Sequence, residues 1–404
     1  MQITFDIYQT VAVAAGVYYL GKLIRKKVSL FSHYCIPAPV IGGLIFAILA
    51  LVLRLTGVLT IEMDITLQSV FMSVFFTSIG FTACFRLIKK GGVQVFLFLG
   101  LIVGLVIMQN ILGSVLAVTF GMNPLLGLCT ASIPMVGGHG TAGSFGPLLA
   151  EMGVTGAATV AIACATYGLI SGSIIGGPIA NRLIEKNKLE PTMEDVVTYA
   201  EQEQDAPKVR HVEIYHFMDA TALLFVAMGI GSIIFNLLKP TGFTFPSYIG
   251  SMLAAAVIRN VCDAKHKELP EREIDVCGNV SLAMFLSMAL MSLKLWELAG
   301  LAMPLIIMLL AQTLLMALYA RFVIFKAMGN DYEGAVMTTA ACGFGMGATP
   351  NAMANMDAVT SRYGPAPKAF FIVPLVGSLF IDFFNGVILT IFINVLPAIQ
   401  NLLG

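Results

Sequence analysis

Apolar runs of membrane-spanning length fill most of this chain, and two of them are interrupted by clusters of glycine. A helix that crosses the hydrocarbon core of a bilayer needs about 20 residues, and many runs of that length follow one another here, separated by short loops. Hydrophobic residues make up 58% of the 404 residues and charged residues 11%, whereas an ordinary soluble domain carries about 25% charge. The sequence therefore predicts an all-α polytopic membrane protein.

Ten segments are predicted to span the membrane as helices. They are 7–24, 36–53, 67–88, 93–119, 157–181, 216–238, 246–260, 276–294, 300–325 and 369–396. The first is followed by a basic cluster, from Lys22 to Lys27, where a cleavable signal peptide would be preceded by one. We therefore interpret it as a retained span.

Two further apolar segments, 124–149 and 333–359, carry the glycine clusters. The first contains Gly137-Gly138-His139-Gly140-Thr141, and the second runs from Gly343 to Pro350. Several glycines close together destabilise a helix, and non-helical backbone at membrane depth is tolerated only where protein or a water-filled cavity supplies hydrogen-bond partners. We interpret each segment as a re-entrant hairpin, which enters and leaves the membrane on the same side.

The alternative is that these glycines only let helices pack closely, as small residues do at many membrane interfaces. We expect that role for Gly172 and Gly176, and for Gly100 and Gly104.

Positive charge orients the chain, because Lys and Arg are enriched in cytoplasmic loops. With ten spans and the N-terminus outside, all 23 Lys and Arg fall on the inside except Arg54, Lys239 and Lys294. Both termini are therefore predicted to be periplasmic, and the polar linker 185–211 to be cytoplasmic. Lys294 lies beside Trp296, and we interpret it as an anchor at the membrane interface.

The linker divides the chain into two halves, 1–184 and 212–404, of five spans and one hairpin each. Five is odd, so the second half is inserted upside down. Weak internal similarity agrees, because the stretch from Ile36-Pro37 to Ile41-Gly42 resembles the stretch from Phe245-Pro246 to Ile249-Gly250, and Gln109 corresponds to Gln312. Inverted repeats with paired helix breaks are typical of secondary transporters, whose binding site lies where the breaks meet.

Polar groups inside apolar runs are candidate site residues. Asp382 and Asn385 share one helical face in the last span, which suits a cation or an ammonium group. A structural ion pair between Asp382 and a distant Lys or Arg is the alternative. Asn351 and Asn355 share a face after the second break, and Asn355 could equally be a hydrogen bond between helices.

Other residues near the breaks have more than one interpretation. Gln109 and Gln312 are expected to join helices by hydrogen bonds. His139 fits a proton sensor, a substrate contact or a hydrogen-bonded scaffold. Thr349 is expected to cap the helix that follows the second break, with Pro350 at its first position.

No Lys or Arg lies in the middle of an apolar run near either break. No basic side chain is therefore expected to face an anionic substrate there, unless Arg86 or Arg321 folds inward. An anionic substrate would then depend on helix N-termini, hydroxyl groups and a bound cation. Carbonyl oxygens at broken helix ends suit Na⁺. This arrangement favours coupling to a cation.

The chain resembles the glutamate:Na⁺ symporter family of bacteria over nearly its whole length. The first half carries Ile36-Pro37-Ala38-Pro39-Val40, the first glycine cluster, Ala163-Cys164-Ala165-Thr166 and Ile175-Gly176-Gly177-Pro178. The second half carries Gly278-Asn279-Val280-Ser281-Leu282, the stretch from Leu293 to Ala299, and the stretch from Cys342 to Pro350.

The resemblance implies Na⁺-coupled uptake of L-glutamate across the bacterial inner membrane, with no enzymatic activity, by a homodimer in which a transport domain moves against a scaffold. The motif positions, with the polar groups described above, are the candidate site residues. The substrate-binding candidates are Gly137, Gly138, His139, Gly140, Thr141, Gly345, Gly347, Thr349, Asn351 and Asn385. The Na⁺ candidates are Thr166, Gly343, Asn355 and Asp382.

Other functions remain as alternatives. A cation-coupled symporter of a di- or tricarboxylate would use the same architecture. An ion channel needs symmetric rings of carbonyl groups around a pore, which a single chain with two repeats does not supply. An intramembrane enzyme would need a catalytic motif such as His-Glu-x-x-His, and none is present. The neutral net charge gives no indication of a nucleic-acid partner.

Overall fold

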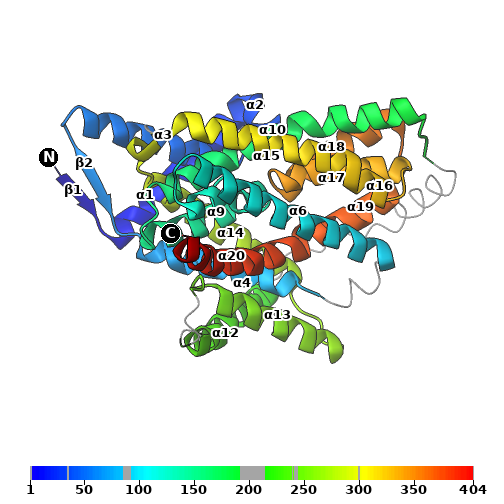
Figure 1. Cartoon of the computed structure of the whole chain (residues 1–404). Helices are drawn as coiled ribbons and strands as arrows, with labels where there is room; N and C mark the ends of the chain where they lie inside the picture. The colour runs from blue at the N-terminus through cyan, green and yellow to red at the C-terminus, as the bar shows by residue number, and fades with distance from the viewer. Residues whose placement is uncertain are drawn as a thin grey trace.

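The computed structural model consists almost entirely of helices (Figure 1) and describes residues 2–33, 36–84, 92–191, 214–238, 240, 244–298 and 301–403. The helices of the first half are α1 Ile7–Lys27, α2 Ser29–His33, α3 Ala38–Leu55, α4 Thr66–Thr82, α6 Gly92–Thr119, α7 Pro124–Leu128, α8 Ser132–Met135, α9 Gly138–Glu151 and α10 Ala157–Asn187. Those of the second half are α12 Ile214–Leu238, α13 Ile249–Ala264, α14 Glu271–Met291, η2 Leu295–Leu298, α15 Ala302–Tyr319, η3 Ala320–Ile324, α16 Phe325–Ala327, α17 Tyr332–Gly345, α18 Thr349–Tyr363, α19 Pro367–Pro374, η4 Leu375–Phe380 and α20 Ile381–Leu403.

The lengths and composition of the helices are those of a polytopic membrane protein. Seven of the described helical segments are long and apolar enough to cross a bilayer, and a pair bent by 41°, Pro367–Gly377 with Ile381–Pro397, makes an eighth. The other two expected spans correspond to α4 and α13, which have 17 and 16 residues. The end of the expected span 67–88 lies outside the described residues. The helical membrane architecture is confirmed, and the number of ten crossings stays a prediction.

A short parallel ribbon was not expected from the sequence. β1 Gln2–Phe5 pairs with β2 Thr60–Met63, so that Gln2 lies opposite Thr60 and Phe5 opposite Met63. Because α1 and α3 pack against each other, the strand before α1 and the strand after α3 meet at one end of the molecule (Figure 1). The ribbon therefore ties the N-terminus to the end of α3.

The helices pack as two groups. In one group α1 lies on α3, α12 lies on α13, and α4 and α14 pack on each other and on these pairs. In the other group α10 lies against α9, α17 and α18, while α6 lies against α7, α15 and α20. Fewer contacts, such as α9 with α14 and α4 with α20, join the two groups. The two glycine-rich segments at which a helix is interrupted both belong to the second group.

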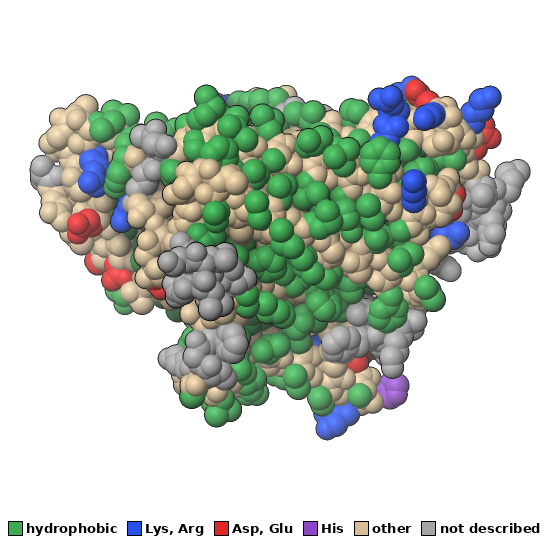
Figure 2. All heavy atoms as spheres, in the orientation of Figure 1, with side chains coloured by type: hydrophobic (Ala, Val, Ile, Leu, Met, Phe, Trp, Pro, Cys, Tyr) green, Lys and Arg blue, Asp and Glu red, His purple; other side chains and the backbone are tan. Residues whose placement is uncertain are grey.

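The outer surface is apolar, as a lipid-facing surface must be. Figure 2 shows hydrophobic side chains over the middle of the molecule, and much of the Lys and Arg of this face over the end where α10 and α18 finish. On α12, Phe225, Ile233 and Leu237 are largely exposed. Side chains of this kind are expected to contact lipid, so their exposure does not indicate a binding site.

The packing of α12 on α13 gives a test of the fold. A Cβ atom built on Gly231 would overlap the backbone of Ser251, whereas one built on Gly229 would meet nothing within 4 Å. We expect Gly231→Leu to lower the melting temperature in detergent by roughly 2–10 °C, because overpacking costs about 1–3 kcal/mol. Gly229→Leu, two residues away on the same helix, is the matched control and should melt like the wild type. Equal melting of the two variants would contradict the packing described here.

Candidate functional site

The two breaks, one from each half of the chain, lie against each other. The first lies between α8, which ends at Met135, and α9, which begins at Gly138. The second lies between α17, which ends at Gly345, and α18, which begins at Thr349. A Cβ atom built on Gly138 would lie 2.8 Å from the carbonyl oxygen of Gly347. Gly138 also has φ +56°, a conformation that L side chains rarely adopt, so its position requires glycine on two grounds.

The unwound stretches are shorter than the glycine clusters. His139, Gly140 and Thr141 already lie in the first turn of α9, and Gly343 and Gly345 are still part of α17. A buried peptide group without a hydrogen bond is costly, so each helix continues as far as its geometry allows. The glycines therefore lie at the ends of helices, and the non-helical segment at each break is short.

The capping prediction at the second break was wrong. Ala348 occupies the N-cap position of α18, and Thr349 is the first helical residue. The extended backbone of Ala348, with φ −165°, makes the turn into the helix. The Thr349 hydroxyl lies instead beside Gly377, 3.2 Å from a Cβ atom built there. The Thr349 side chain is therefore directed toward the last span.

Amide side chains supply the partners that the second break needs. Gln109 Nε2 donates to the carbonyl oxygen of Gly345 at 2.9 Å, at the end of α17. Gln312 Nε2 in turn donates to the carbonyl oxygen of Gln109, also at 2.9 Å. Both glutamines are fully buried. They form the helix–helix hydrogen bonds expected of them, and Gln109 in particular holds the broken end of α17.

Amide side chains also hold the start of α8, the helix that leads to the first break, and of the residues involved Asn110 and Ser132 were not among the predicted site residues. The Ser132 backbone N–H donates to Asn110 Oδ1 at 3.2 Å, and Asn385 Nδ2 donates to the Ser132 carbonyl oxygen at 3.2 Å. Ser132 begins α8, the helix that precedes the glycine cluster. The available signal was that Asn110 and Ser132 are polar residues inside apolar runs. Asn385 is thereby placed against the first hairpin.

Helices α17 and α18, on either side of the second break, pack on a glycine-lined face of α10. Asn351 Nδ2 donates to the Leu169 carbonyl oxygen at 2.7 Å. Asn355 Nδ2 lies 3.2 Å from the carbonyl oxygens of both Gly172 and Thr339. These contacts match the alternative interpretation of Asn355, as a hydrogen bond between helices.

Close approach along this face depends on the glycines of α10. A Cβ atom on Gly172 would lie 2.7 Å from the Cys342 carbonyl oxygen, and one on Gly176 would overlap the amide of Asn355. The packing role expected for Gly172 and Gly176 is confirmed. Gly104 lies close to Tyr319, whereas Gly100 meets nothing within 4 Å, so the packing prediction for Gly100 was wrong within this chain.

His139 and Thr166 are brought into contact. His139 Nε2 lies 3.0 Å from Thr166 Oγ1, and the hydroxyl also lies 3.3 Å from the Ile162 carbonyl oxygen. His139 is buried at the start of α9, while Gly140 faces the ring of Phe75. The contact joins a substrate candidate on the first hairpin to a Na⁺ candidate on α10.

Asp382 lies half-buried in the first turn of α20 and forms no hydrogen bond or salt bridge with another described residue. The alternative of a structural ion pair is therefore not found within the part of the chain that the structure describes. Arg86 lies outside it, and Arg321 lies with its guanidinium 5.4 Å from the centre of the Phe322 ring. Gly343, another Na⁺ candidate, has a carbonyl oxygen that already accepts from the Ala348 N–H at 3.3 Å.

Several buried oxygens near the breaks have no hydrogen-bond partner among the described residues. They are Ser132 Oγ, Thr339 Oγ1, Asn351 Oδ1 and Asn385 Oδ1. A buried polar atom without a partner costs about 1–3 kcal/mol, so these four oxygens are candidates for contact with water, an ion or a substrate. Oxygen atoms suit hard cations, and the adjacent N-termini of α9 and α18 suit an anion.

Comparisons with known proteins identify the family of the chain. The sequence profile of the sodium/glutamate symporter family matches residues 3–365. The chain belongs to that family. It is 39% identical over 395 residues to the sodium/glutamate symporter of Haemophilus influenzae, covering 97% of this chain and 98% of the relative. It is also 39% identical over 394 residues to the sodium/glutamate symporters of Escherichia coli and Shigella flexneri, covering 96% of this chain and 97% of each relative. The family resemblance stated from the motifs is confirmed.

The contact between the breaks can be tested at Gly138. We expect Gly138→Ala to reduce uptake by at least about tenfold while membrane insertion is retained, because the Cβ atom adds a strained backbone of about 1–2 kcal/mol to a clash with Gly347. Initial uptake rates in proteoliposomes, normalised to the amount of inserted protein, measure this effect.

Gly121→Ala is the matched control for strain. Gly121 has φ +69°, but nothing lies within 4 Å of a Cβ atom there. If both variants transported equally well, the contact between the breaks would have no role in transport.

Proposed function

We propose that this protein is a secondary active transporter that carries L-glutamate into the cell together with Na⁺ by alternating access. The observation that carries the proposal is the meeting of two broken helices, one from each half, in a member of the sodium/glutamate symporter family. Helices α9 and α18 begin at these breaks, and Asn351, in the first turn of α18, has a buried Oδ1 atom without a partner among the described residues. Family membership also indicates a transporter rather than an enzyme.

The glutamate carboxylates are proposed to bind at the start of α9 and α18. Backbone N–H groups of a helix N-terminus carry partial positive charge and attract anions. The residues proposed to contact substrate are Gly137, Gly138, His139, Gly140, Thr141, Gly345, Gly347, Thr349, Asn351 and Asn385. The free Oδ1 atoms of Asn351 and Asn385 suit the ammonium group of the substrate or a cation beside it.

Na⁺ is proposed to bind close to the substrate, so that its charge offsets the negative charge of glutamate. The candidates remain Thr166, Gly343, Asn355 and Asp382. Asp382 is the strongest of them, because its carboxylate has no partner among the described residues. Thr166 is also attractive, since its hydroxyl joins α10 to the first hairpin.

Two inverted repeats, each with a re-entrant hairpin, are the proposed architecture. Packing supports it, because exchanging the halves maps one set of contacts onto another: α1 with α3 corresponds to α12 with α13, α3 with α14 to α13 with α4, and α6 with α20 to α15 with α10. Gly42 and Gly250, which the internal similarity aligns, each lie against the helix before them. The second group of helices would be the transport domain and the first group the scaffold.

The proposed setting is the bacterial inner membrane, with both termini periplasmic, the linker 185–211 cytoplasmic and two copies of the chain forming a homodimer. The charge distribution supports this orientation. Of the three cations assigned to the outside, Arg54 and Lys294 line one pocket, and Lys239 lies outside the described residues. Arg362 and Glu185, both assigned to the inside, form a salt bridge at 3.3 Å.

Dependence on Na⁺ is the first test. We expect glutamate uptake into proteoliposomes to fall to background when external Na⁺ is replaced by K⁺ or choline, because no Na⁺ gradient is then available. Unchanged uptake would remove the coupling from the proposal. The alternative is that this transporter carries a di- or tricarboxylate such as malate or citrate. If either acid inhibited the uptake of labelled glutamate more strongly than unlabelled glutamate does, this alternative would be favoured.

The Asp382 carboxylate is the second test. We expect Asp382→Asn to raise the Na⁺ concentration for half-maximal uptake by about tenfold or more, since losing a charge that faces a cation costs at least about 1.4 kcal/mol. Asp219→Asn, at an exposed position on α12, is the matched control. A wild-type Na⁺ dependence of the Asp382 variant would show that this carboxylate does not bind the ion.

A further inference from the structure

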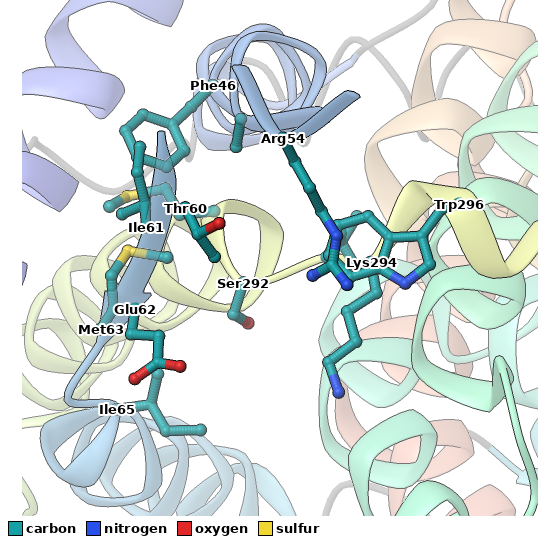
Figure 3. A pocket seen from close by; sticks show the side chains of 13 residues that line it. Phe46, Arg54, Thr60, Ile61, Glu62, Met63, Ile65, Ser292, Lys294 and Trp296 are labelled. Carbon is teal, nitrogen blue, oxygen red and sulfur yellow. The ribbon is translucent and has the colours of Figure 1, made fainter. Parts of the chain in front are cut away.

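A pocket of about 440 Å³ lies away from the two breaks, between the end of α3, the strand β2 and the segment that follows α14. This volume is within the range of small-molecule sites, about 300–1,000 Å³. Figure 3 shows Arg54 and Lys294 on one side of it, beside Trp296, and the Glu62 carboxylate on the opposite side. The pocket therefore presents two positive charges facing one negative charge.

These three charges are free to bind a ligand. None of Arg54, Glu62 and Lys294 forms an ion pair with another described residue, and all three are exposed. Exposed charges on fixed backbone are inexpensive to keep unpaired in water, yet they attract oppositely charged molecules.

The surrounding structure holds the charges in place. The Arg54 guanidinium lies 3.9 Å from the centre of the Trp296 ring, which leaves the N–H groups at its edge available for a carboxylate. Pairing of β2 with β1 places Glu62 opposite Thr4. The hydroxyl of Thr159 on α10 lies 3.5 Å from the Lys294 carbonyl oxygen, which ties this segment to the helix that carries Thr166.

We propose that this pocket is a second binding site for an acidic α-amino acid, in which Arg54 and Lys294 bind its two carboxylates and Glu62 binds its ammonium group. Glutamate carries two negative charges and one positive charge, so it complements the pocket charge for charge. The choice of glutamate rests on the proposed function, and the existence of the site does not.

A second pocket adjoins the proposed site and extends toward α10. This pocket, of about 280 Å³, shares Ser292, Leu293 and Lys294 with the first and extends to Ile162 on α10. The carbonyl oxygen of Ile162 accepts a hydrogen bond from Thr166, which contacts His139. The second pocket therefore reaches the helix that carries Thr166, next to the backbone that carries Lys294.

The only tryptophan of the chain reports directly on the site. Trp296 is the single tryptophan, so all indole fluorescence comes from this pocket. We expect L-glutamate to produce a saturable change in Trp296 fluorescence of the purified protein in neutral detergent with K⁺ and no Na⁺. Binding at the breaks requires Na⁺ under the proposed function, so this condition isolates the second site. A change that appears only with Na⁺, or that is lost in Gly138→Ala, would come from the breaks and would overturn the proposal.

Charge variants test the assigned roles. We expect Arg54→Gln and Lys294→Gln each to raise the midpoint of the titration by about tenfold or more, whereas Lys267→Gln, at an exposed position elsewhere, leaves it unchanged. Midpoints are compared rather than intensities, because Arg54→Gln alters the surroundings of Trp296 itself.

Glu62 has a sharper test. Glutarate lacks only the ammonium group, so the wild type should bind it more weakly than glutamate, and Glu62→Gln should abolish that difference. An unchanged preference for glutamate in Glu62→Gln would overturn the assignment.

The phosphate of a lipid headgroup could bind the same two cations, so a lipid is the competing ligand for this pocket. We expect glycerol 3-phosphate to leave the fluorescence unchanged at concentrations where glutamate saturates, because it has no group for Glu62. An equal response would assign the pocket to lipid.

Uptake separates this inference from the proposed function. Lys294→Gln should raise the KM for glutamate uptake severalfold without changing kcat, and added choline chloride at constant Na⁺ should reduce the difference by screening. Wild-type protein without Na⁺-driven uptake would refute the proposed function, whereas normal uptake with an unchanged KM in Lys294→Gln would refute the second site alone.

Discussion

A helix that ends inside the bilayer leaves backbone groups that lipid cannot satisfy, and the arrangement of this protein around its breaks follows from that constraint. Gln109 supplies a partner at the end of α17, while Asn110 and Asn385 supply partners at the start of α8. Glycines of α10, such as Gly172, let the second hairpin come close enough to be covered by protein. In this way the ends of the broken helices are covered by protein instead of lipid.

The placement of charge follows a related constraint. A full charge near the bilayer centre costs about 2.5–3.5 kcal/mol or more. The polar groups at the breaks are accordingly mostly helix ends, amides and hydroxyls, and the carboxylate of Asp382 lies three residues before Asn385 on α20. At the water-exposed end, full charges cost little, and Arg54, Lys294 and Glu62 face one pocket there. Under the two proposals, glutamate, with two carboxylates and one ammonium group, would meet fixed charges first and helix dipoles with a co-transported cation afterwards.

Much of the helical layout follows from residue patterns, because apolar length and glycine clusters are local properties. The aligned glycines Gly42 and Gly250 both lie at helix–helix contacts, as expected of related positions. Predictions failed where the outcome depended on neighbours from other helices. Gly100 faces open space, and the partnership of Asn110 with Ser132 was not anticipated. The N-cap of α18 is a local exception, because the extended backbone of Ala348 makes the turn that Thr349 was expected to make.

The sequence by itself determined a helical membrane protein, the two sites of helix breakage and the family, since hydropathy, glycine content and motif runs are properties of the chain alone. Only the tertiary structure decided that Gly138 meets Gly347, that His139 contacts Thr166, and that Arg54, Glu62 and Lys294 line one pocket. These contacts join residues from distant parts of the chain. Their geometry depends on how whole helices pack, which no local pattern encodes.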